Sequence, residues 1–105
     1  MALTKAKELV SSNPVMVFSK TSCPFCTGVK KLLTDIGANF KTYELDSESD
    51  GRDMQSALAE WTGQRTVPNV FVGGNHIGGC DATTALHSQG KLVPALTQSG
   101  ALAKS

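Results

Sequence analysis

Two cysteines stand three residues apart in the segment from Ser19 to Cys26, which reads SKTSCPFC. Helical neighbours at this spacing have Cβ atoms about 5–6 Å apart, and a disulfide accepts Cα separations near 5.5 Å. Cys23 and Cys26 could therefore form and break a disulfide with little backbone movement. Pro24 suits the first helical position, because its φ angle is preset and the amide hydrogen that it lacks would have no partner there. This places Cys23 just outside the first turn of a helix.

The predicted position of Cys23 favours its thiolate. The amides without partners and the partial positive charge at a helix N-terminus stabilise an anion, and Lys20 adds a cation nearby. No acidic residue occurs from Val15 to Thr34. Because the thiolate is the form that attacks a disulfide, Cys23 is predicted to be the nucleophile. Cys26, on the inward face of the helix, is predicted to be the resolving thiol.

Three other interpretations of the pair remain open. A permanent disulfide closing so small a loop would restrain little of the unfolded chain, and a reducing cytosol would open it. A zinc site needs four ligands, and only Cys80, His76 and His87 could join the pair. These three residues do not form the second short Cys-x-x-Cys or His-x-x-x-His spacing that is typical of zinc sites. The third alternative is chance placement in a helix. Proline between the cysteines, directly after a buried strand, is typical of a redox site at a strand-to-helix junction.

The elements predicted around this pair alternate between strand and helix. The apolar run Val15 to Phe18 indicates a strand, and the apolar spacing from Pro24 to Ile36 predicts a helix that stops at Gly37. A second strand, Phe40 to Leu45, is parallel to the first if the two pair. The remaining predicted elements are a helix between Gly51 and Gly63, a hairpin of strands Asn69 to Val72 and Asn75 to Ile77, a helix capped by Asp81 that ends before Gly90, and a last helix beginning over Leu92 to Leu96. These elements predict an α/β fold with a mixed sheet.

Length and composition limit the possible functions. The 105 residues, of which 40% are apolar, fit one domain spanning residues 1–105. A net charge of +1 offers no broad basic face for nucleic acid or an anionic membrane. No apolar stretch approaches the roughly 20 residues that cross a bilayer, and the start MALTKAKELV lacks the features of a secretory signal. We expect a soluble cytoplasmic protein without nucleic-acid or membrane partners, although a removed targeting peptide remains open.

Three motifs in the chain, KTSCPFC, TVPNVFVGG and GGCD, resemble those of the dithiol glutaredoxins and especially of plant cytosolic members. The resemblance extends from about Val15 to Leu96. It implies a thioredoxin-like fold with a four-stranded mixed sheet flanked by helices. It also implies a glutathione-dependent thiol–disulfide oxidoreductase that reduces glutathione mixed disulfides and protein disulfides, with glutathione as co-substrate. We expect a monomer whose partners are glutathione and the proteins that carry such disulfides.

The resemblance assigns roles to individual residues. Cys23 would accept glutathione, and Cys26 would resolve protein disulfides. Val67 would pair its backbone with the cysteine of glutathione, next to Pro68 in the cis form. The other implied glutathione contacts are Lys20 and Gln64 at the glycine carboxylate, Cys80 and Asp81 at the γ-glutamyl end, and Phe25, which keeps the ring but lacks the hydroxyl of the tyrosine that the family most often has there. Arg65 could assist or be a solvated charge, and Asp81 could also serve only as a helix cap.

Two rival functions are weighed on the same residues. One is a [2Fe–2S] cluster shared by two chains through Cys23 and two glutathiones. Pro24 argues against it, because the usual cluster binders have a smaller residue there. The other is a thioredoxin-type reductant, which lacks support because that family places Trp before the first cysteine and Gly-Pro between the pair. Cys80 is either a small buried residue or a partly exposed thiol that becomes oxidised or glutathionylated. Packing or surface roles are expected for His76, His87, Met54 and Trp61.

Overall fold

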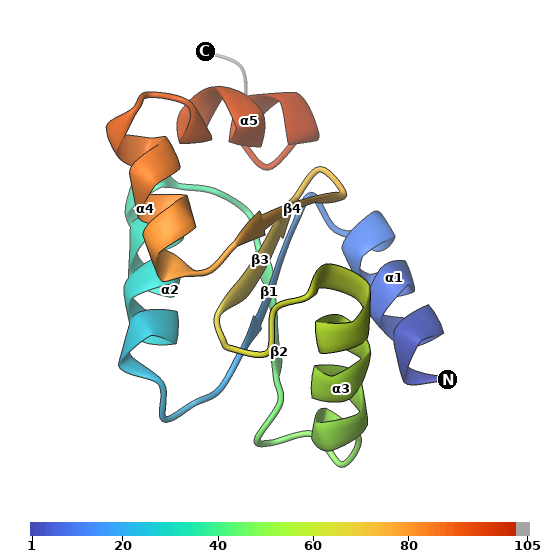
Figure 1. The fold of residues 1–105 in the computed structure, drawn as a ribbon. Helices are drawn as coiled ribbons and strands as arrows, with labels where there is room; N and C mark the ends of the chain where they lie inside the picture. Colours follow the sequence, from blue (N-terminus) through green and yellow to red (C-terminus); the bar gives the residue numbers. More distant parts are fainter. Residues whose placement is uncertain (103–105) are drawn as a thin grey trace.

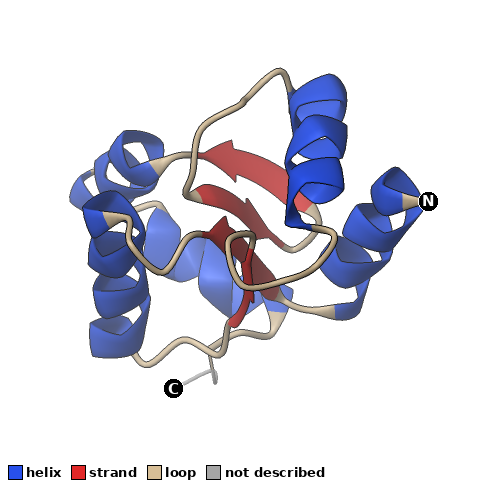
Figure 2. Cartoon of the chain, turned by 90° about the horizontal axis from the view of Figure 1, so that it is seen from below, coloured by secondary structure: helices blue, strands red, loops and turns tan. Residues whose placement is uncertain are grey.

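The structure is a computed structural model that describes residues 1–102. A four-stranded sheet lies between two layers of helices, as Figures 1 and 2 show from two directions. The elements in chain order are α1 (Ala2–Ser12), β1 (Val15–Ser19), α2 (Pro24–Ile36), β2 (Lys41–Glu44), α3 (Gly51–Thr62), β3 (Asn69–Val72), β4 (Asn75–Gly78), α4 (Cys80–Ser88) and α5 (Leu92–Ser99). Among residues 1–102, no helix is both long and apolar enough to cross a membrane.

The central strand β1 is buried along its whole length and supplies both apolar faces of the sheet. Val15 and Val17 face the core formed with α2 and α5. Met16 and Phe18 face the core formed with α1 and α3. Alternate residues of a strand point to opposite faces, so a short apolar run such as VMVF can fill two cores at once. This explains why β1 reads as a continuous apolar run.

The strand order is β2-β1-β3-β4, and the sheet is mixed as predicted. β1 runs parallel to β2, with Phe18 opposite Tyr43, and antiparallel to β3, with Phe18 opposite Asn69. The antiparallel pair brings the end of β1 beside the beginning of β3. The segments that follow Ser19 and precede Asn69 therefore meet at one edge of the sheet.

Helix α1 was not predicted from the sequence. Its buried residues Ala6 and Val10 are four apart and pack in the core beneath α3, which is the spacing of one helical face. Lys5 fixes the helix from outside, because its Nζ donates to Tyr43 Oη and to Asp50 Oδ2, both at 2.8 Å. The sequence of the first ten residues, which lacks the features of a secretory signal, therefore forms an amphipathic helix.

The prediction that Asp81 caps α4 is wrong. The helix begins at Cys80, and Gly79 is its N-cap in an extended conformation. The carbonyl of Gly79 accepts hydrogen bonds from the backbone N–H and the hydroxyl of Thr83, at 3.1 and 2.9 Å. The chain therefore enters the helix before Asp81, which lies in the first turn.

Two neighbouring leucines of α2 differ in burial, so their variants can test which face of the helix packs into the core. Leu33 is fully buried, whereas Leu32 is only partly buried against the same core. We predict that Leu33→Ala lowers the free energy of unfolding by about 2–5 kcal/mol, through lost burial and a cavity, and that Leu32→Ala lowers it by less than half as much. Urea unfolding of both variants measures this difference, and equal losses would contradict the packing described.

Candidate active site

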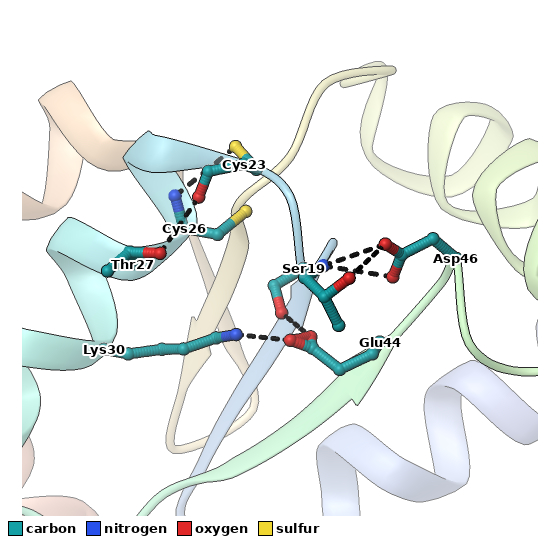
Figure 3. A network of polar contacts seen from close by, with 8 residues as sticks. Ser19, Cys23, Cys26, Thr27, Lys30, Glu44 and Asp46 are labelled. Carbon is teal, nitrogen blue, oxygen red and sulfur yellow. Dashed lines mark hydrogen bonds and ion pairs between the residues drawn. The ribbon is translucent and has the colours of Figure 1, made fainter.

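Cys23 is the N-cap residue of α2, as the sequence predicted. Its backbone is extended, with φ −95° and ψ 116°, and Pro24 follows at the first helical position. The backbone N–H of Cys26 donates a hydrogen bond to the Cys23 Sγ at 3.4 Å (Figure 3). A sulfur in this position accepts from an amide that has no partner within the helix. The local fold therefore directs a polar backbone group at the predicted nucleophile.

Several groups together lower the pKa of Cys23. Burial by itself would raise this pKa, but hydrogen bonds from the Cys26 thiol and from the backbone N–H groups of Cys26 and Phe25 favour the anion, and so does the charge of Lys30. The net shift is downward. Thiolate is the reactive form of cysteine, so a lowered pKa increases the reactive fraction at neutral pH.

Cys26 behaves in the opposite way. It is buried without solvent exposure, and burial raises the pKa of its thiol to about 12. Cys26 is therefore protonated at neutral pH, and its thiol can donate to Cys23. All three cysteines, Cys23, Cys26 and Cys80, are free thiols in this structure. The two thiols thus differ in exposure and in protonation, and the inward position of Cys26 agrees with the sequence analysis.

The cation that lowers the pKa of Cys23 is Lys30, a residue that the sequence analysis did not consider. Lys30 extends from α2 below the cysteine pair and forms an ion pair with Glu44 of β2 (Figure 3). The hydroxyl of Ser19 also donates to Glu44. Lys20 lies instead beside Asp46, where its charge contributes to the lowered pKa of that carboxyl, after the larger effect of hydrogen bonds from Thr21.

Acidic groups also reach the cysteine loop, although none is close in the sequence. Asp46 accepts hydrogen bonds from the backbone N–H and the hydroxyl of Thr21, at 3.0 and 2.6 Å, and so secures the loop that precedes Cys23. Glu44 and Asp46 come from β2 and the segment after it, which the parallel pairing with β1 brings alongside. The local absence of acidic residues around Cys23 therefore does not describe the charge of the folded site.

The Val67–Pro68 peptide bond is cis, as the resemblance implied. The carbonyl oxygen of Val67 lies 3.8 Å from the Cys23 Sγ. Gln64 lies in the same loop, and its side-chain nitrogen donates to the carbonyls of Thr66 and Pro68, at 3.0 and 2.9 Å. The structure therefore brings Gln64, Val67 and Pro68 together beside Cys23.

A cavity of about 500 Å³ opens next to the cysteine loop. Its lining includes the cations Lys20 and Arg52, the amide of Gln55 and three carboxylates, those of Asp46, Glu48 and Asp53. Gln64 is not among the lining residues. Gln55 donates from its side chain to the carbonyl of Arg65 at 2.9 Å. Sequence reasoning missed Arg52 and Gln55, because polar positions on the outer face of a helix carry no periodic signal of function.

The start of α4 reaches the proline loop from β4. A Cβ at Gly79 would lie 3.5 Å from the carbonyl oxygen of Pro68. Cys80 is half-buried, with its sulfur 3.9 Å from the hydroxyl of Thr84, and Asp81 is exposed. Phe25, between the two thiols, is 64% exposed. Cys80 is thus partly exposed, as the second of the two alternatives expected, and its oxidation stays a prediction.

The two histidines and the large apolar residues of α3 lie in packed or surface positions. His76 bonds from its Nε2 to Asn69 Oδ1 at 2.8 Å. His87 is exposed in the last turn of α4. Met54 is buried, and Trp61 stacks on Phe71 with ring centroids 5.0 Å apart. Within residues 1–102, no three side chains of His, Cys, Asp or Glu are placed to hold a metal ion.

The two neighbouring lysines of α2 allow a test of the electrostatics. Lys30 lowers the pKa of Cys23, whereas Lys31 is 75% exposed and pairs with Asp35. We predict that Lys30→Met raises the pKa of Cys23, because the thiolate loses a nearby cation, and that Lys31→Met changes it much less. Titration by the ultraviolet absorbance of the thiolate measures the shift. Equal shifts in the two variants would contradict the role of Lys30.

The different protonation of the two thiols predicts selective alkylation. The rate at Cys23 should rise as pH increases through its lowered pKa and then level off, because only the thiolate reacts. Cys26, with a pKa of about 12, should stay unmodified at neutral pH. Peptide mass spectrometry after brief exposure to iodoacetamide distinguishes the two sites. Equal labelling at neutral pH would contradict this arrangement.

Comparisons with known proteins agree with this geometry. The glutaredoxin family model matches residues 15–77. A glutaredoxin from Ricinus communis is 72% identical over 97% of this chain and all of its own length, and glutaredoxin-C2 from Arabidopsis thaliana is 69% identical over 98% of this chain and 93% of its own length. The crystal structure of a buckwheat glutaredoxin–glutathione complex superimposes with a TM-score of 0.97, at 62% identity, over 98% of this chain and 94% of that chain. The fold is thus thioredoxin-like, and because the likeness includes the Cys23–Cys26 pair and nearly the whole chain, the protein belongs to the dithiol glutaredoxins, a family of oxidoreductases.

Proposed function

We propose that this protein uses glutathione to reduce glutathione mixed disulfides and protein disulfides through Cys23 and Cys26. The observation that carries the proposal is the pair of thiols at the start of α2, one with a lowered pKa and the other buried and protonated. The membership of an oxidoreductase family and the likeness to a buckwheat glutaredoxin–glutathione complex support it. Cys23 and Cys26 would each act in a separate step of the reaction.

For a glutathione mixed disulfide, Cys23 alone completes the cycle. Its thiolate attacks the glutathione sulfur, a new disulfide joins Cys23 to glutathione, and the target thiolate leaves and takes a proton from solvent. The thiolate of a second glutathione then attacks the bound glutathione sulfur. This step releases oxidised glutathione and restores the thiolate of Cys23, so that one disulfide is reduced and one is formed.

For a protein disulfide, the buried thiol is also required. Cys23 attacks one sulfur and forms a mixed disulfide with the target protein. Cys26 then attacks the Cys23 sulfur, and its proton ends on the departing target thiol. The resulting Cys23–Cys26 disulfide is reduced by two glutathione molecules, which leave as oxidised glutathione. The high pKa of Cys26 keeps this second thiol from reacting before Cys23 is occupied.

The surroundings of Cys23 offer groups for each part of glutathione. Val67 would pair its backbone with the cysteine of the tripeptide, close to the Cys23 sulfur. Lys20, at the cavity that also contains Arg52 and Gln55, would attract the glycine carboxylate. Asp81 would accept from the γ-glutamyl ammonium, beside the half-buried Cys80. The exposed ring of Phe25 would cover the apolar part of the bound disulfide.

The alternative is a [2Fe–2S] cluster between two chains, with Cys23 as the ligand from each. Cys26 is buried and protonated at neutral pH, so glutathione would have to supply the other two thiolates. Visible absorbance after anaerobic purification would support this alternative, and a colourless monomer would count against it. A monomeric state and a cytoplasmic location stay predictions.

Three serine variants test the proposed roles in a glutathione-coupled assay. With a small glutathione mixed disulfide, Cys23→Ser should fall to the uncatalysed background, because no thiolate remains to attack. Cys26→Ser should keep this activity and lose reduction of an intramolecular protein disulfide. Cys80→Ser should change either rate only modestly. Activity retained by Cys23→Ser would overturn the assignment.

A further inference from the structure

Asp50 and Gly51 form a dipeptide whose chemistry is independent of the cysteines. It is the only Asp-Gly or Asn-Gly pair in the sequence. When glycine follows aspartate, no side chain shields the glycine nitrogen, and this nitrogen can attack the carboxyl group of the aspartate. The product is a five-membered succinimide ring, which water opens to aspartate or to isoaspartate. The pair is therefore a candidate site of backbone modification.

The conversion of Asp50 takes two steps and needs no oxidant or reductant. In the first, the Gly51 nitrogen bonds to the Asp50 Cγ and loses its proton, and the carboxylic acid loses its hydroxyl group, so that one water leaves. In the second, one water adds to the ring. Cleavage between the Gly51 nitrogen and the main-chain carbon gives isoaspartate, and cleavage at Cγ restores aspartate. The acid form is the reactive one, because a carboxylate has no hydroxyl group to lose.

The fold requires glycine at position 51. A Cβ there would lie 1.7 Å from the carbonyl oxygen of Leu45, far inside any van der Waals contact. Gly51 is buried and is the first residue of α3. A side chain at this position would push α3 away from the segment that follows β2. The packing therefore keeps an unhindered backbone nitrogen directly after Asp50.

The contacts of Asp50 restrain its carboxyl group. Asp50 Oδ2 accepts a hydrogen bond from Lys5 Nζ at 2.8 Å, and Oδ1 accepts one from the hydroxyl of Tyr43. The side chain makes no capping hydrogen bond with α3. The hydrogen bond from Lys5 and then that from Tyr43 lower the pKa of Asp50. The reactive acid form is therefore scarce while α1 is in place.

The attacking nitrogen is also engaged in the folded chain. The backbone N–H of Gly51 donates to the carbonyl of Glu48 at 3.1 Å, and the carbonyl of Asp50 accepts from the backbone N–H of Met54 at 2.9 Å. Ring closure would remove the first of these hydrogen bonds. Isoaspartate adds a methylene group to the backbone and would displace the second. The conversion therefore conflicts with the first turn of α3, which carries Arg52 at the cavity beside the cysteine loop.

We propose that Asp50–Gly51 is a site of isoaspartate formation, and that Lys5 and Tyr43 restrain this reaction in the folded protein by holding both carboxylate oxygens of Asp50. The ion pair between α1 and Asp50 then protects the backbone as well as fastening the helix. The nearest rival is Asp46, whose following residue Ser47 has a side chain that hinders the nitrogen. This proposal does not depend on the glutathione reaction.

The test incubates the full-length protein in water enriched in oxygen-18 at mildly acidic pH. Each passage through the succinimide adds one oxygen-18 atom to the residue that formed it. Trypsin, used afterwards in ordinary water, cleaves after Lys41 and Arg52 and releases residues 42–52. This peptide contains both Asp46 and Asp50, and fragmentation in the mass spectrometer assigns the label to one or the other. Asp46 is thus an internal comparison.

Four samples are compared with the folded parent protein. In the parent unfolded in urea, the label should enter at Asp50 faster than at Asp46. In the folded state, Lys5→Met should raise the rate at Asp50 by about threefold, the effect expected when a solvent-exposed ion pair is lost, and Tyr43→Phe should raise it similarly. Lys7→Met is the matched control, because Lys7 also fastens α1, with its Nζ 5.5 Å from the centre of the Trp61 ring, but has no contact with Asp50. It should leave the rate unchanged.

The folding of the variants does not confuse the result. Tyr43→Phe keeps the buried ring, and the side chain of Lys5 is 48% exposed. Faster labelling at Asp46 than at Asp50 in urea would overturn the assignment of the site. Unchanged rates in both Lys5→Met and Tyr43→Phe would show that the carboxylate contacts do not restrain the reaction. An equal rise in Lys7→Met and Lys5→Met would assign the effect to general loosening of α1 and would also overturn the proposal.

Discussion

The backbone amides at the start of a helix impose the constraint on which the active site depends. Four N–H groups there have no partner within the helix, and in this protein one of them donates to the sulfur of Cys23. Pro24 allows the helix to begin directly after the extended N-cap residue. The lowered pKa of Cys23 increases its thiolate fraction, and a thiolate that is stabilised in this way is also a good leaving group in disulfide exchange. One local geometry would thus assist both halves of the proposed reaction.

The second thiol shows how burial separates two chemically identical groups within one helical turn. Cys26 lies inside, and burial keeps it protonated, whereas Cys23 remains at the surface of the loop. Lys30 stabilises the thiolate form and is itself held by Glu44 of the neighbouring strand. The different exposure and protonation of the two thiols therefore follow from packing as much as from the sequence spacing of the cysteines.

The strands and most helices could be predicted because their apolar patterns are local. The run that forms β1 and the stripe of α2 up to Gly37 are of this kind, and the structure confirms both. Helix α1 has a weaker pattern, because only two of its residues, Ala6 and Val10, are buried. The predicted start of α4 lies two residues too late, because Asp is a common cap, whereas the extended conformation of Gly79 cannot be inferred from the sequence.

The active site was only partly predictable, because several of its contacts depend on packing between elements. Cys23 and Cys26 follow from spacing alone, whereas the cis bond before Pro68 was available only through the resemblance. The sequence alone could not show that Lys30, rather than Lys20, lowers the pKa of Cys23. The effect of Lys30 depends on which side of α2 faces the cysteines. The hydrogen bonds of a side chain such as Gln64 with nearby carbonyls likewise have no signature in the sequence.

The antiparallel pairing of β1 with β3 has a consequence for how catalytic competence arises. Cys23 and Val67 are 44 residues apart in the chain and meet only because Phe18 lies opposite Asn69. A slip of one residue in this pairing would turn the side chains of β3 to the opposite face and move the proline loop away from the sulfur. A fragment that ends before Val67 would keep both cysteines of α2 but lack the backbone that lies beside the Cys23 sulfur. Under the proposed function, turnover of a glutathionylated substrate would therefore report the correct assembly of the central sheet during refolding.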